Sequence, residues 1–597
     1  MNALTIFEFS DELSSYLAGT ETISPNDHGD MVLALRPSVQ AKLKELGIPF
    51  RTSYDYFDRT SHETLVLKSE EILQTARKRI HIDDDIGIKE GYNNAYLFYM
   101  RCFVHYLLFL IEVIDRCVGE TDSRFIVAPH SGRPKDLTPL VGREYRYIDQ
   151  VAALVSRNKN IALKRFGIVK ETTQRNATPK RIPAVLEQIM RVLSYEISAG
   201  IIDKLSKGKR IVCAPTGAYN MASFMSAIQG VDKQLFVLYL SSKNKWQDLK
   251  RSIREKSEGS LWTLPETARS KQKQAFMRKL NATTDRMESA FASHPDRMTY
   301  RGIDFSKMVF ERIRLGIHPL LVKLYSQTVS LERTLKRYRP AAIFSPHSRE
   351  ISYNLGELGR KHRIPSLLVS HGSHVPPKNR FESIEWREHG KGLMDSHYDY
   401  VAVQTPWAKA YREKIEDRSQ GIVTGPLIFA KRTKQWNSAT SLRQRMIPGH
   451  EDKFVVLQAS TPKTREVIRF CTYETVDEYI RNINDLIEAV APLDGVYLII
   501  RFRPLPDLSE QNFAHLVRLS DNAGIHSSGT FEDYLNLSDL LVSYSSTTIE
   551  EALQNDLPVL QYDPQGKYYH VSGTHIDPEK DPQVDSCYFV DSKPNLQ

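Results

Sequence analysis

The chain has 597 residues, which is long for a single hydrophobic core, so two or more domains are expected. Its content of 41% hydrophobic and 26% charged residues is ordinary for a soluble globular protein. The net charge of +9 favours phosphate-bearing partners or an anionic membrane surface, and because no DNA- or RNA-binding signature accompanies it, no nucleic acid partner is expected.

The cysteines and the N-terminal residues predict a cytoplasmic protein. The five cysteines are scattered with no Cys-x-x-Cys spacing, which argues against a disulfide framework and against a zinc site. The N-terminal residues lack the basic start and long apolar core of a signal peptide. The most apolar run, Tyr96 to Ile114, is interrupted by Arg101, His105 and Glu112, so it predicts a buried helix rather than a membrane span.

Strands alternate with helices in the first half of the chain, which implies a parallel sheet covered on both faces. A long helix is expected over 93–117 and a largely helical region over 137–205. The one obvious acidic cluster, Asp83 to Asp85, has no neighbouring ligand set, so no required metal is expected. The expected strands here are 31–35, 49–51, 124–128, 210–214 and 235–240, with shorter helices over 38–46 and 221–228.

The stretch 241–287 is rich in lysine and arginine, with Trp246, Trp262 and Phe276 between the basic residues. One interpretation is a solvated helical insertion in the N-terminal domain. The other is contact with anionic lipid or a charged acceptor, because basic segments that carry aromatic residues favour such surfaces. The sequence leaves both interpretations open.

Polar turns follow several predicted strands after a helix that is expected over about 305–338. The strand 341–345 is followed by Pro346 to Glu350 and a helix that runs to 361, and the strand 365–369 is followed by Ser370-His371-Gly372. A third strand is expected over 398–404. The polar and basic stretch 429–451 is interpreted as the linker between an N-terminal domain, 1–428, and a C-terminal domain, 452–597.

The C-terminal domain contains a βαβ pattern with a hydroxyl-rich turn, Ser545-Ser546-Thr547, at the carboxyl end of a strand, where open α/β sheets bind ligands. The hydroxyl groups and the start of the following helix can bind a phosphate. Thr547 and Glu550 also match a capping box, which would explain both residues without a ligand. The expected strands are 453–458, 496–501, 540–543, 558–562 and 587–590, with helices over 473–490, 509–520 and 548–554.

Two successive α/β domains with polar turns at their strand ends resemble the GT-B glycosyltransferases. The likeness extends from about 339 to 590 and rests on Ser370-His371-Gly372 and on the stretch 538–546, followed by Glu550-Glu551-Ala552 and Leu557-Pro558-Val559. Within that class the chain is similar to the bacterial transferases that build surface polysaccharides and teichoic acids, a group that includes polysialyltransferases and glycerophosphotransferases. The implied fold is α/β, with two Rossmann-like domains and a helix-rich N-terminal half.

This resemblance implies a glycosyltransferase that moves a sugar from a nucleotide-activated donor to a growing cell-surface polysaccharide or lipid-linked glycan. Its partners would be a nucleotide-sugar and a glycan or glycolipid acceptor, with no required cofactor. It would lie in the cytoplasm or peripherally at the inner face of the cytoplasmic membrane. Such a transfer needs a base for the acceptor hydroxyl and groups that stabilise the departing phosphate.

His371 is the first candidate for the base, because imidazole titrates near neutrality and Gly372 allows close backbone approach, and His347 is the second. Each candidate also has an ordinary structural explanation, such as a hydrogen-bonding histidine, an exposed basic turn or a surface acid. The donor side would comprise Lys463, Arg465, Arg501, Arg503, Ser545, Ser546, Thr547 and Glu551, and the acceptor side Thr216, Gly217, Asn220, Arg349 and Gly372.

Two features depart from the resemblance. Arg503 stands where relatives often have a histidine, and an arginine can bind phosphate but cannot act as an acid or base. The chain also ends soon after the strand 587–590, whereas GT-B enzymes usually continue into helices that return to the first domain. Two other functions therefore stay open, a nucleotide-sugar epimerase of the same fold and a non-catalytic GT-B-like scaffold in a polysaccharide assembly complex.

Overall fold

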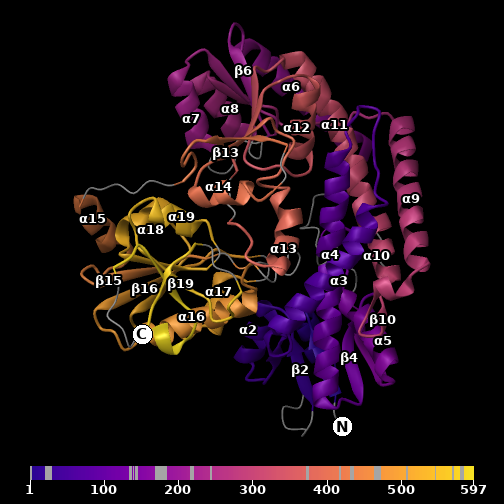
Figure 1. Ribbon diagram of the computed structural model, residues 1–597, viewed down its shortest axis with the longest axis vertical. Helices are drawn as coiled ribbons and strands as arrows, with labels where there is room; N and C mark the ends of the chain where they lie inside the picture. The colour runs from indigo at the N-terminus through magenta and orange to yellow at the C-terminus, as the bar shows by residue number, and fades with distance from the viewer. Residues whose placement is uncertain are drawn as a thin grey trace.

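Three separate parallel sheets, of five, seven and seven strands, form the framework of the molecule. In Figure 1 the first sheet lies below, the second above, and the third to the side, with a layer of long helices joining the first two. The computed structural model describes residues 3–19, 30–132, 137–138, 140, 145–168, 184–215, 221–241, 245–370, 375–415, 418–429, 436–460, 462, 472–505, 508–544, 546–567, 571–577 and 584–596.

The first sheet has the strand order β3-β2-β1-β4-β5. All five residues of its central strand β1 are buried, as expected for a parallel strand covered on both faces. Its strands are β1 Ala3–Phe7, β2 Met31–Ala34, β3 Arg51–Thr52, β4 Phe125–His130 and β5 Ala162–Ile168, and its helices are α1 Ser10–Ala18, α2 Pro37–Glu45 and α5 Tyr147–Lys159.

A helical layer connects the first sheet to the second. Its centre is α4, which is long and apolar enough to cross a membrane by length and composition, but 94% of its most apolar window is buried inside the protein. The expectation of a buried helix is therefore confirmed. The helix expected over 305–338 is continuous through a π-helical turn, Ile313–Ile317. The layer consists of α3 Arg59–Arg77, α4 Glu90–Thr121, α9 Ser270–Ala292, α10 Ser306–Arg312 and α11 His318–Tyr338.

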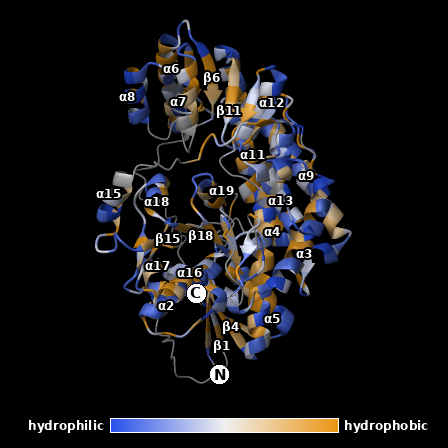
Figure 2. Cartoon of the chain, turned by 60° about the vertical axis from the view of Figure 1, so that its left-hand side comes forward, coloured by the Kyte–Doolittle hydropathy of each residue, from blue (hydrophilic) through white to orange (hydrophobic). Residues whose placement is uncertain are grey.

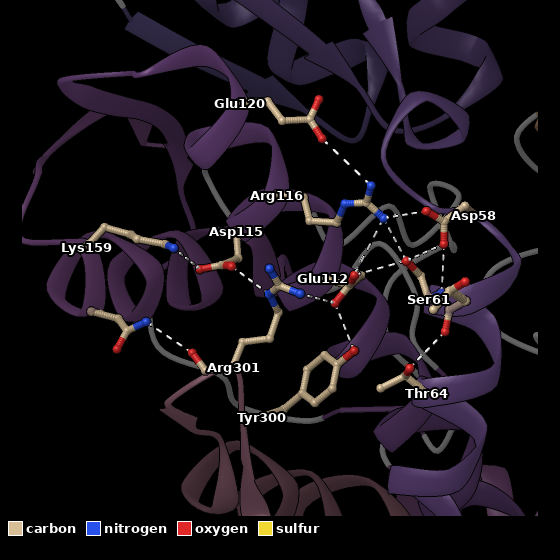
Figure 3. Close-up of polar contacts among 12 residues, drawn as sticks. Asp58, Ser61, Thr64, Glu112, Asp115, Arg116, Glu120, Lys159, Tyr300 and Arg301 are labelled. Atoms are coloured by element: carbon tan, nitrogen blue, oxygen red, sulfur yellow. Dashed lines mark hydrogen bonds and ion pairs between the residues drawn. The ribbon is translucent and has the colours of Figure 1, made fainter.

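Buried charges fasten this layer to a small hairpin, β9 Thr299–Tyr300 and β10 Ile303–Asp304 (Figure 3). The guanidinium of Arg301 contacts Glu112 at 3.1 Å and Asp115 at 2.6 Å, and both carboxylates lie on α4. The hydroxyl of Tyr300 also donates to Glu112, at 2.8 Å. Because both acids are buried, these partners offset the cost of removing two charges from water.

The second sheet has the order β14-β13-β12-β11-β6-β7-β8. The stretch 241–287, which the sequence suggested to be an insertion, supplies the edge strand β8 and the helix α8 of this part of the fold, and most of α9 in the helical layer. Its strands are β6 Arg210–Ala214, β7 Leu235–Tyr239, β8 Glu258–Ser260, β11 Ala342–Ser345, β12 Ser366–Leu368, β13 Tyr400–Val403 and β14 Gln420–Val423, and its helices are α6 Ala184–Leu205, α7 Met221–Val231, α8 Lys245–Glu255, α12 Ile351–Lys361, α13 Arg380–Gly390 and α14 Pro406–Arg412.

The third sheet has the order β17-β16-β15-β18-β19-β21-β20. The helix α15 Trp436–Met446 lies in the stretch interpreted as a linker, and it packs against the third sheet's helix α18. Its strands are β15 Phe454–Gln458, β16 Val496–Arg501, β17 Ala523–His526, β18 Leu540–Ser543, β19 Val559–Tyr562, β20 Thr574–His575 and β21 Cys587–Val590, and its helices are α16 Val476–Val490, α17 Glu510–Leu516, α18 Phe531–Leu537 and α19 Thr548–Leu553.

The α/β class with Rossmann-like parallel sheets is confirmed, but the range 1–428 is not built on one sheet as expected. It holds two sheets, because the strands before 168 and those from 210 onward pair only among themselves. The first sheet also contacts the third, chiefly through α2 and α17. Figure 2 shows apolar residues concentrated along the strands and inner helix faces; one large core runs from the first sheet through the helical layer to the second, and the third sheet has cores of its own.

Candidate functional site

The strand orders define where ligands are expected. In an open parallel sheet, ligands bind outside the carboxyl ends of the two adjacent strands at which the strand order reverses. In the second sheet those strands are β6 and β11, and in the third they are β15 and β18. The acceptor-side residues around 216–220 and 347–349 follow β6 and β11, while the donor-side residues 463–465 and 545–547 follow β15 and β18. The sequence-predicted residues therefore follow the strands at two reversal points.

The carboxyl edges of these two sheets face each other. Thr405 follows β13 of the second sheet, and its hydroxyl donates to a carboxylate oxygen of Glu550 on α19 of the third sheet, at 3.1 Å. Both residues are buried, Glu550 completely. Thr405 also caps α14, since its hydroxyl oxygen accepts from the backbone N–H of Ala408 at 3.1 Å. Thr405 thus follows a strand of the second sheet, caps the next helix and bonds to the third sheet's domain.

The hydroxyl turn of the third sheet does not form the capping box that the sequence allowed. Thr547 makes no side-chain cap on α19, and Glu550 accepts the bond from Thr405 instead. The next hydroxyl, of Thr548, donates to the carbonyl of Ala459 at the end of β15, at 2.8 Å. Ser546 accepts from the backbone N–H of Thr548 at 3.3 Å. The turn is therefore held against the neighbouring strand, and Ser546 and Thr547 stay partly exposed at its rim.

The turn after β11 carries the candidates His347 and Arg349. His347 is partly buried, and its Nε2 lies 3.4 Å from the hydroxyl of Ser352. The guanidinium of Arg349 lies over the ring of Phe98 at 4.5 Å and contacts His389 Nδ1 at 2.6 Å. This packing fixes the Arg349 side chain in one position at the reversal point of the second sheet.

Glu350, at the end of the same turn, has a strained backbone, with φ of 48° and ψ of −122°. Its carboxylate accepts from the hydroxyl of Tyr99 on α4. Burial and this carboxylate raise the pKa of Tyr99 above its usual range. A cavity of about 40 Å³ lies against Ser348, Arg349 and Glu350, room for roughly three water molecules or one small polar group. The hydroxyl of Ser348 is buried there without a hydrogen-bond partner among the described residues.

Buried acids gather between α13 and the carboxyl edge of the third sheet. Burial raises the pKa of Glu382, on α13, to about 7. Burial likewise raises the pKa of Glu474 to about 7, although Asn482 donates to it at 2.6 Å and opposes the shift. Carboxyl groups that titrate near neutrality can both take and give a proton, and strongly shifted groups of this kind concentrate at functional sites.

Tyr544, the first residue after β18, stands at the centre of these acids. Burial, followed by the charges of Asp563, Glu478, Glu474 and Glu382, raises its pKa well above its usual value. Its hydroxyl is buried and has no hydrogen-bond partner within the described parts of the chain. A buried hydroxyl without a partner is costly, so it is a natural donor to an oxygen of a bound ligand.

Glu478 differs from its neighbours because it is ion-paired. Burial would raise its pKa, but Lys567, His62 and the backbone N–H of Thr475 together lower it, and Lys567 Nζ lies 2.9 and 3.0 Å from the two carboxylate oxygens. The cluster thus contains one acid that stays ionised and two that titrate near neutrality. Environments that separate acids in this way are typical of acid and base groups in enzymes.

Other donor-side candidates have less direct positions. The guanidinium of Arg501 lies over the rings of Phe531 and Tyr534, at 5.5 and 5.1 Å, on the β17 side of the sheet. Arg503 is exposed and Glu551 is partly exposed. Their roles in donor binding stay predictions. The candidates Thr216, Gly217, Asn220, His371, Gly372, Lys463, Arg465 and Ser545 lie outside the described residues.

The reversal point of the first sheet, between β1 and β4, is filled by the chain's own charges. Glu8 pairs with Arg36 at 3.0 Å and Glu12 with Arg146 at 2.5 Å. Both guanidinium groups also lie over the ring of Phe9. All four charged residues are buried, so these side chains bind one another rather than a ligand. The candidate site therefore lies between the second and third sheets.

The described residues contain no group of three or more His, Cys, Asp or Glu arranged to hold a metal ion. The carboxylates of the acidic run Asp83 to Asp85 are bonded to other side chains of the protein. Asp83 pairs with Lys279 at 3.0 Å, and Asp85 accepts from the hydroxyl of Tyr325 at 2.7 Å. Asp84 accepts from Tyr92 at 2.6 Å. That metal is not required stays a prediction.

The sequence analysis missed Glu382, Glu474 and Tyr544. Glu474 lies within the helix expected over 473–490. Tyr544 directly follows an expected strand and lies within the motif that was singled out, so its place after a buried strand was a usable signal. Glu382 had no such signal, because α13 is rich in charged residues and resembles an exposed segment. Its buried face, which includes Glu382, Glu385 and Trp386, has no simple apolar pattern.

No protein-family model matches the chain, and no curated protein matches it in sequence. Among solved structures, it is similar to the UDP-GlcNAc 2-epimerase of Neisseria meningitidis bound to UDP-GlcNAc, with 13% identity, 59% of this chain and 82% of that chain covered, and a TM-score of 0.36. The UDP-GlcNAc 2-epimerase of Methanocaldococcus jannaschii has 11% identity, coverages of 65% and 89%, and a TM-score of 0.35. The spinosyn rhamnosyltransferase SpnG has 14% identity, coverages of 59% and 80%, and a TM-score of 0.29.

Proposed function

We propose that the chain is a glycosyltransferase that uses a nucleotide-sugar donor. The observation that carries this proposal is the pair of reversal points, β6/β11 and β15/β18, whose carboxyl edges face each other across the contact between Thr405 and Glu550. Two ligand sites at facing sheet edges would suit a reaction in which a group passes from one bound molecule to another.

The donor would bind at the third sheet. Its phosphates would lie against the turn at Ser546 and Thr547, and the hydroxyl of Tyr544, which has no partner among the described residues, would donate to a phosphate or sugar oxygen. Lys463, Arg465 and Ser545 are proposed to complete this side. A hydrogen bond to the departing phosphate that strengthens as negative charge develops there lowers the free-energy barrier of the transfer.

The acceptor would bind at the second sheet, near Arg349 and the small cavity beside it. The acceptor hydroxyl must lose a proton, and two groups are proposed to take it. His371 is the residue that the sequence favoured. Glu382 is the residue that the structure adds, because its pKa of about 7 keeps part of it ionised at neutral pH. The proposed acceptor class is a cell-surface polysaccharide or lipid-linked glycan, with no required metal.

Nucleotide binding is the first test of the proposal. Thermal unfolding of the purified chain would be followed with nucleoside diphosphates and their sugars. A ligand at about 100 times its dissociation constant stabilises the fold by about 2.7 kcal/mol, which is readily measured. Ser546→Ala and Tyr544→Phe should each reduce this stabilisation, whereas Ser289→Ala, on exposed α9, should not. No stabilisation by any nucleotide would refute the transferase proposal for this chain.

The base is tested by the dependence of transfer on pH. Glu382 also accepts from the backbone N–H of Lys378 at 2.8 Å and from the side chain of Asn379, so it helps to start α13. Glu382→Gln keeps one oxygen, which can accept one of these two bonds, but cannot take a proton. We expect it to reduce kcat by roughly 10²–10⁴-fold and to remove a limb near pH 7 from the rate profile. An unchanged profile, with activity lost in His371→Ala, would assign the role to His371.

An epimerase is the second candidate function, because two buried acids with pKa values of about 7 also suit proton removal and return at a sugar carbon. The two activities differ in their need for an acceptor. An epimerase would convert the nucleotide-sugar alone and incorporate solvent deuterium into it. A transferase would leave the donor intact until an acceptor is added.

A further inference from the structure

Exposed apolar side chains are concentrated on two neighbouring helices of the second sheet, α6 and α8. Of the nineteen large hydrophobic residues that are exposed in the described chain, six lie on α6 and two on α8. Scattered exposed hydrophobics are normal, but a contiguous group marks an interaction surface. On α6 they are Leu186, Ile189, Met190, Val192, Leu193 and Ile197, and on α8 they are Trp246 and Ile253.

The exposed residues of α6 form a stripe opposite its packed face. Leu186, Met190, Leu193 and Ile197 recur at intervals of four, three and four residues, so they share one side of the helix over about 17 Å. The packed side is marked by Tyr195, which is bonded to Thr334, and by Ala199 and Ile202, all buried. A helix that is apolar on both sides is normally covered on both, but this stripe is exposed.

The neighbouring helix α8 adds two exposed apolar side chains. It lies beside α6, with Lys245 Nζ donating to the hydroxyl of Ser194 at 3.4 Å, and both helices lie at the end of the molecule far from the chain termini (Figure 1 and Figure 2). Its inner side faces the sheet through Arg251, whose guanidinium lies over Tyr239. Trp246, which is 73% exposed, therefore lies on the outer side with Ile253.

The charged side chains of the two helices that lack an ion-pair partner among the described residues are positive. Every carboxylate on the two helices has a basic partner, whereas Lys204 and Lys250 are exposed and form no ion pair with any described residue. Within the described parts of the chain their positive charges are therefore unpaired. The pairs are Glu187 with Arg191, Glu196 and Asp203 with Arg337, Asp248 with Arg251, and Glu255 with Arg254.

We propose that the outer face of α6 and α8 docks on an anionic lipid surface. The apolar side chains and Trp246 would enter the interface, while the lysines lie at the phosphate level and attract anionic headgroups. A second copy of the chain fits the face less well, because a symmetric contact would bring the unpaired Lys204 and Lys250 of both copies together. This docking is independent of the proposed sugar transfer and is tested without it.

The test is sedimentation of the full chain with vesicles of phosphatidylcholine, with or without phosphatidylglycerol. We expect binding only when phosphatidylglycerol is present, and weaker binding at high salt. The double variant Leu193→Ser with Ile197→Ser should weaken binding at least tenfold. Lys204→Glu with Lys250→Glu should weaken it at least about 25-fold, from a factor of about five for each lysine.

Two control variants distinguish binding through this surface from nonspecific binding to vesicles. Val423→Ser removes a side chain that is 73% exposed on β14, at the opposite edge of the same sheet, and Lys307→Glu reverses an exposed charge on α10. Both should bind vesicles as the unaltered chain does, and all variants should keep its thermal unfolding temperature. The proposal is overturned if the chain ignores anionic vesicles or if the α6 variants bind unchanged. It is also overturned if sedimentation velocity shows a dimer that these variants dissociate.

Discussion

The substitution Glu474→Gln should make the stability of the third domain, the C-terminal domain that holds the third sheet, less sensitive to pH. The pKa of Glu474 rises from 4.5 to about 7, mainly through burial, so between these values the folded chain holds a proton that the unfolded chain releases. Stability therefore falls as pH rises through this window. The shift corresponds to about 3 kcal/mol once the pH exceeds 7. A glutamine keeps an oxygen for Asn482, which donates at 2.6 Å, and never ionises.

Calorimetric unfolding of the two proteins at about pH 5 and about pH 8 measures this effect. The variant should be close to the unaltered chain at the lower pH and more stable by about 3 kcal/mol at the higher one. For a domain of this size that difference corresponds to roughly 6–12 °C in the unfolding temperature of the third domain. Because other acids titrate equally in both proteins, the difference between them isolates Glu474. A difference that is the same at both pH values would refute the assigned cause.

Thr405→Val should destabilise the contact between the second and third sheets by about 2–4 kcal/mol, because it removes both the cap of α14 and the donor to buried Glu550. Thr405→Ser keeps both bonds and should cost under about 1 kcal/mol in the same denaturant titration, so equal losses would contradict this role. Arg301→Ala should cost about 2–3 kcal/mol, since Glu112 and Asp115 stay buried with one partner fewer. Hydrogen exchange of α4 would report that loss, and unchanged protection would show that the remaining partners suffice.

The strands that the sequence predicted best are short apolar runs between turn residues. The bounds of β6, β16, β18 and β21 match the expected ranges, because buried parallel strands differ sharply from the polar turns around them. Two edge strands lacked that contrast. β5 exposes Lys164 and Arg165, and β8, Glu258–Ser260, has no apolar side chain, so neither resembles a strand in sequence.

Sheet membership could not be predicted from the same signals. A strand's own residues favour an extended conformation, but the strands it pairs with are decided by contacts between residues that are far apart in the sequence. β1 pairs with β4 across the whole of α3 and α4, and β6 pairs with β11 across α9 and α11. One run of alternating elements over 1–428 therefore fits either one sheet or two. The positions that depend only on local order, such as the turns after β11 and β18, were placed correctly.

The contacts of helix α13 explain why the sequence pattern did not reveal the acids of the site. The helix contacts all three parts of the molecule, because Arg387 pairs with Glu70 on α3, the carbonyl of Glu385 accepts from Arg101 on α4 at 3.1 Å, and its carboxylate accepts from Thr472 at 3.2 Å. A helix with polar partners on several sides needs polar residues on several sides, which abolishes the apolar stripe. The same contacts mean that the third domain cannot separate from the second without exposing the Glu385 carboxylate. Separation of the second and third sheets would therefore also act, through α13, on α3 and α4 of the helical layer.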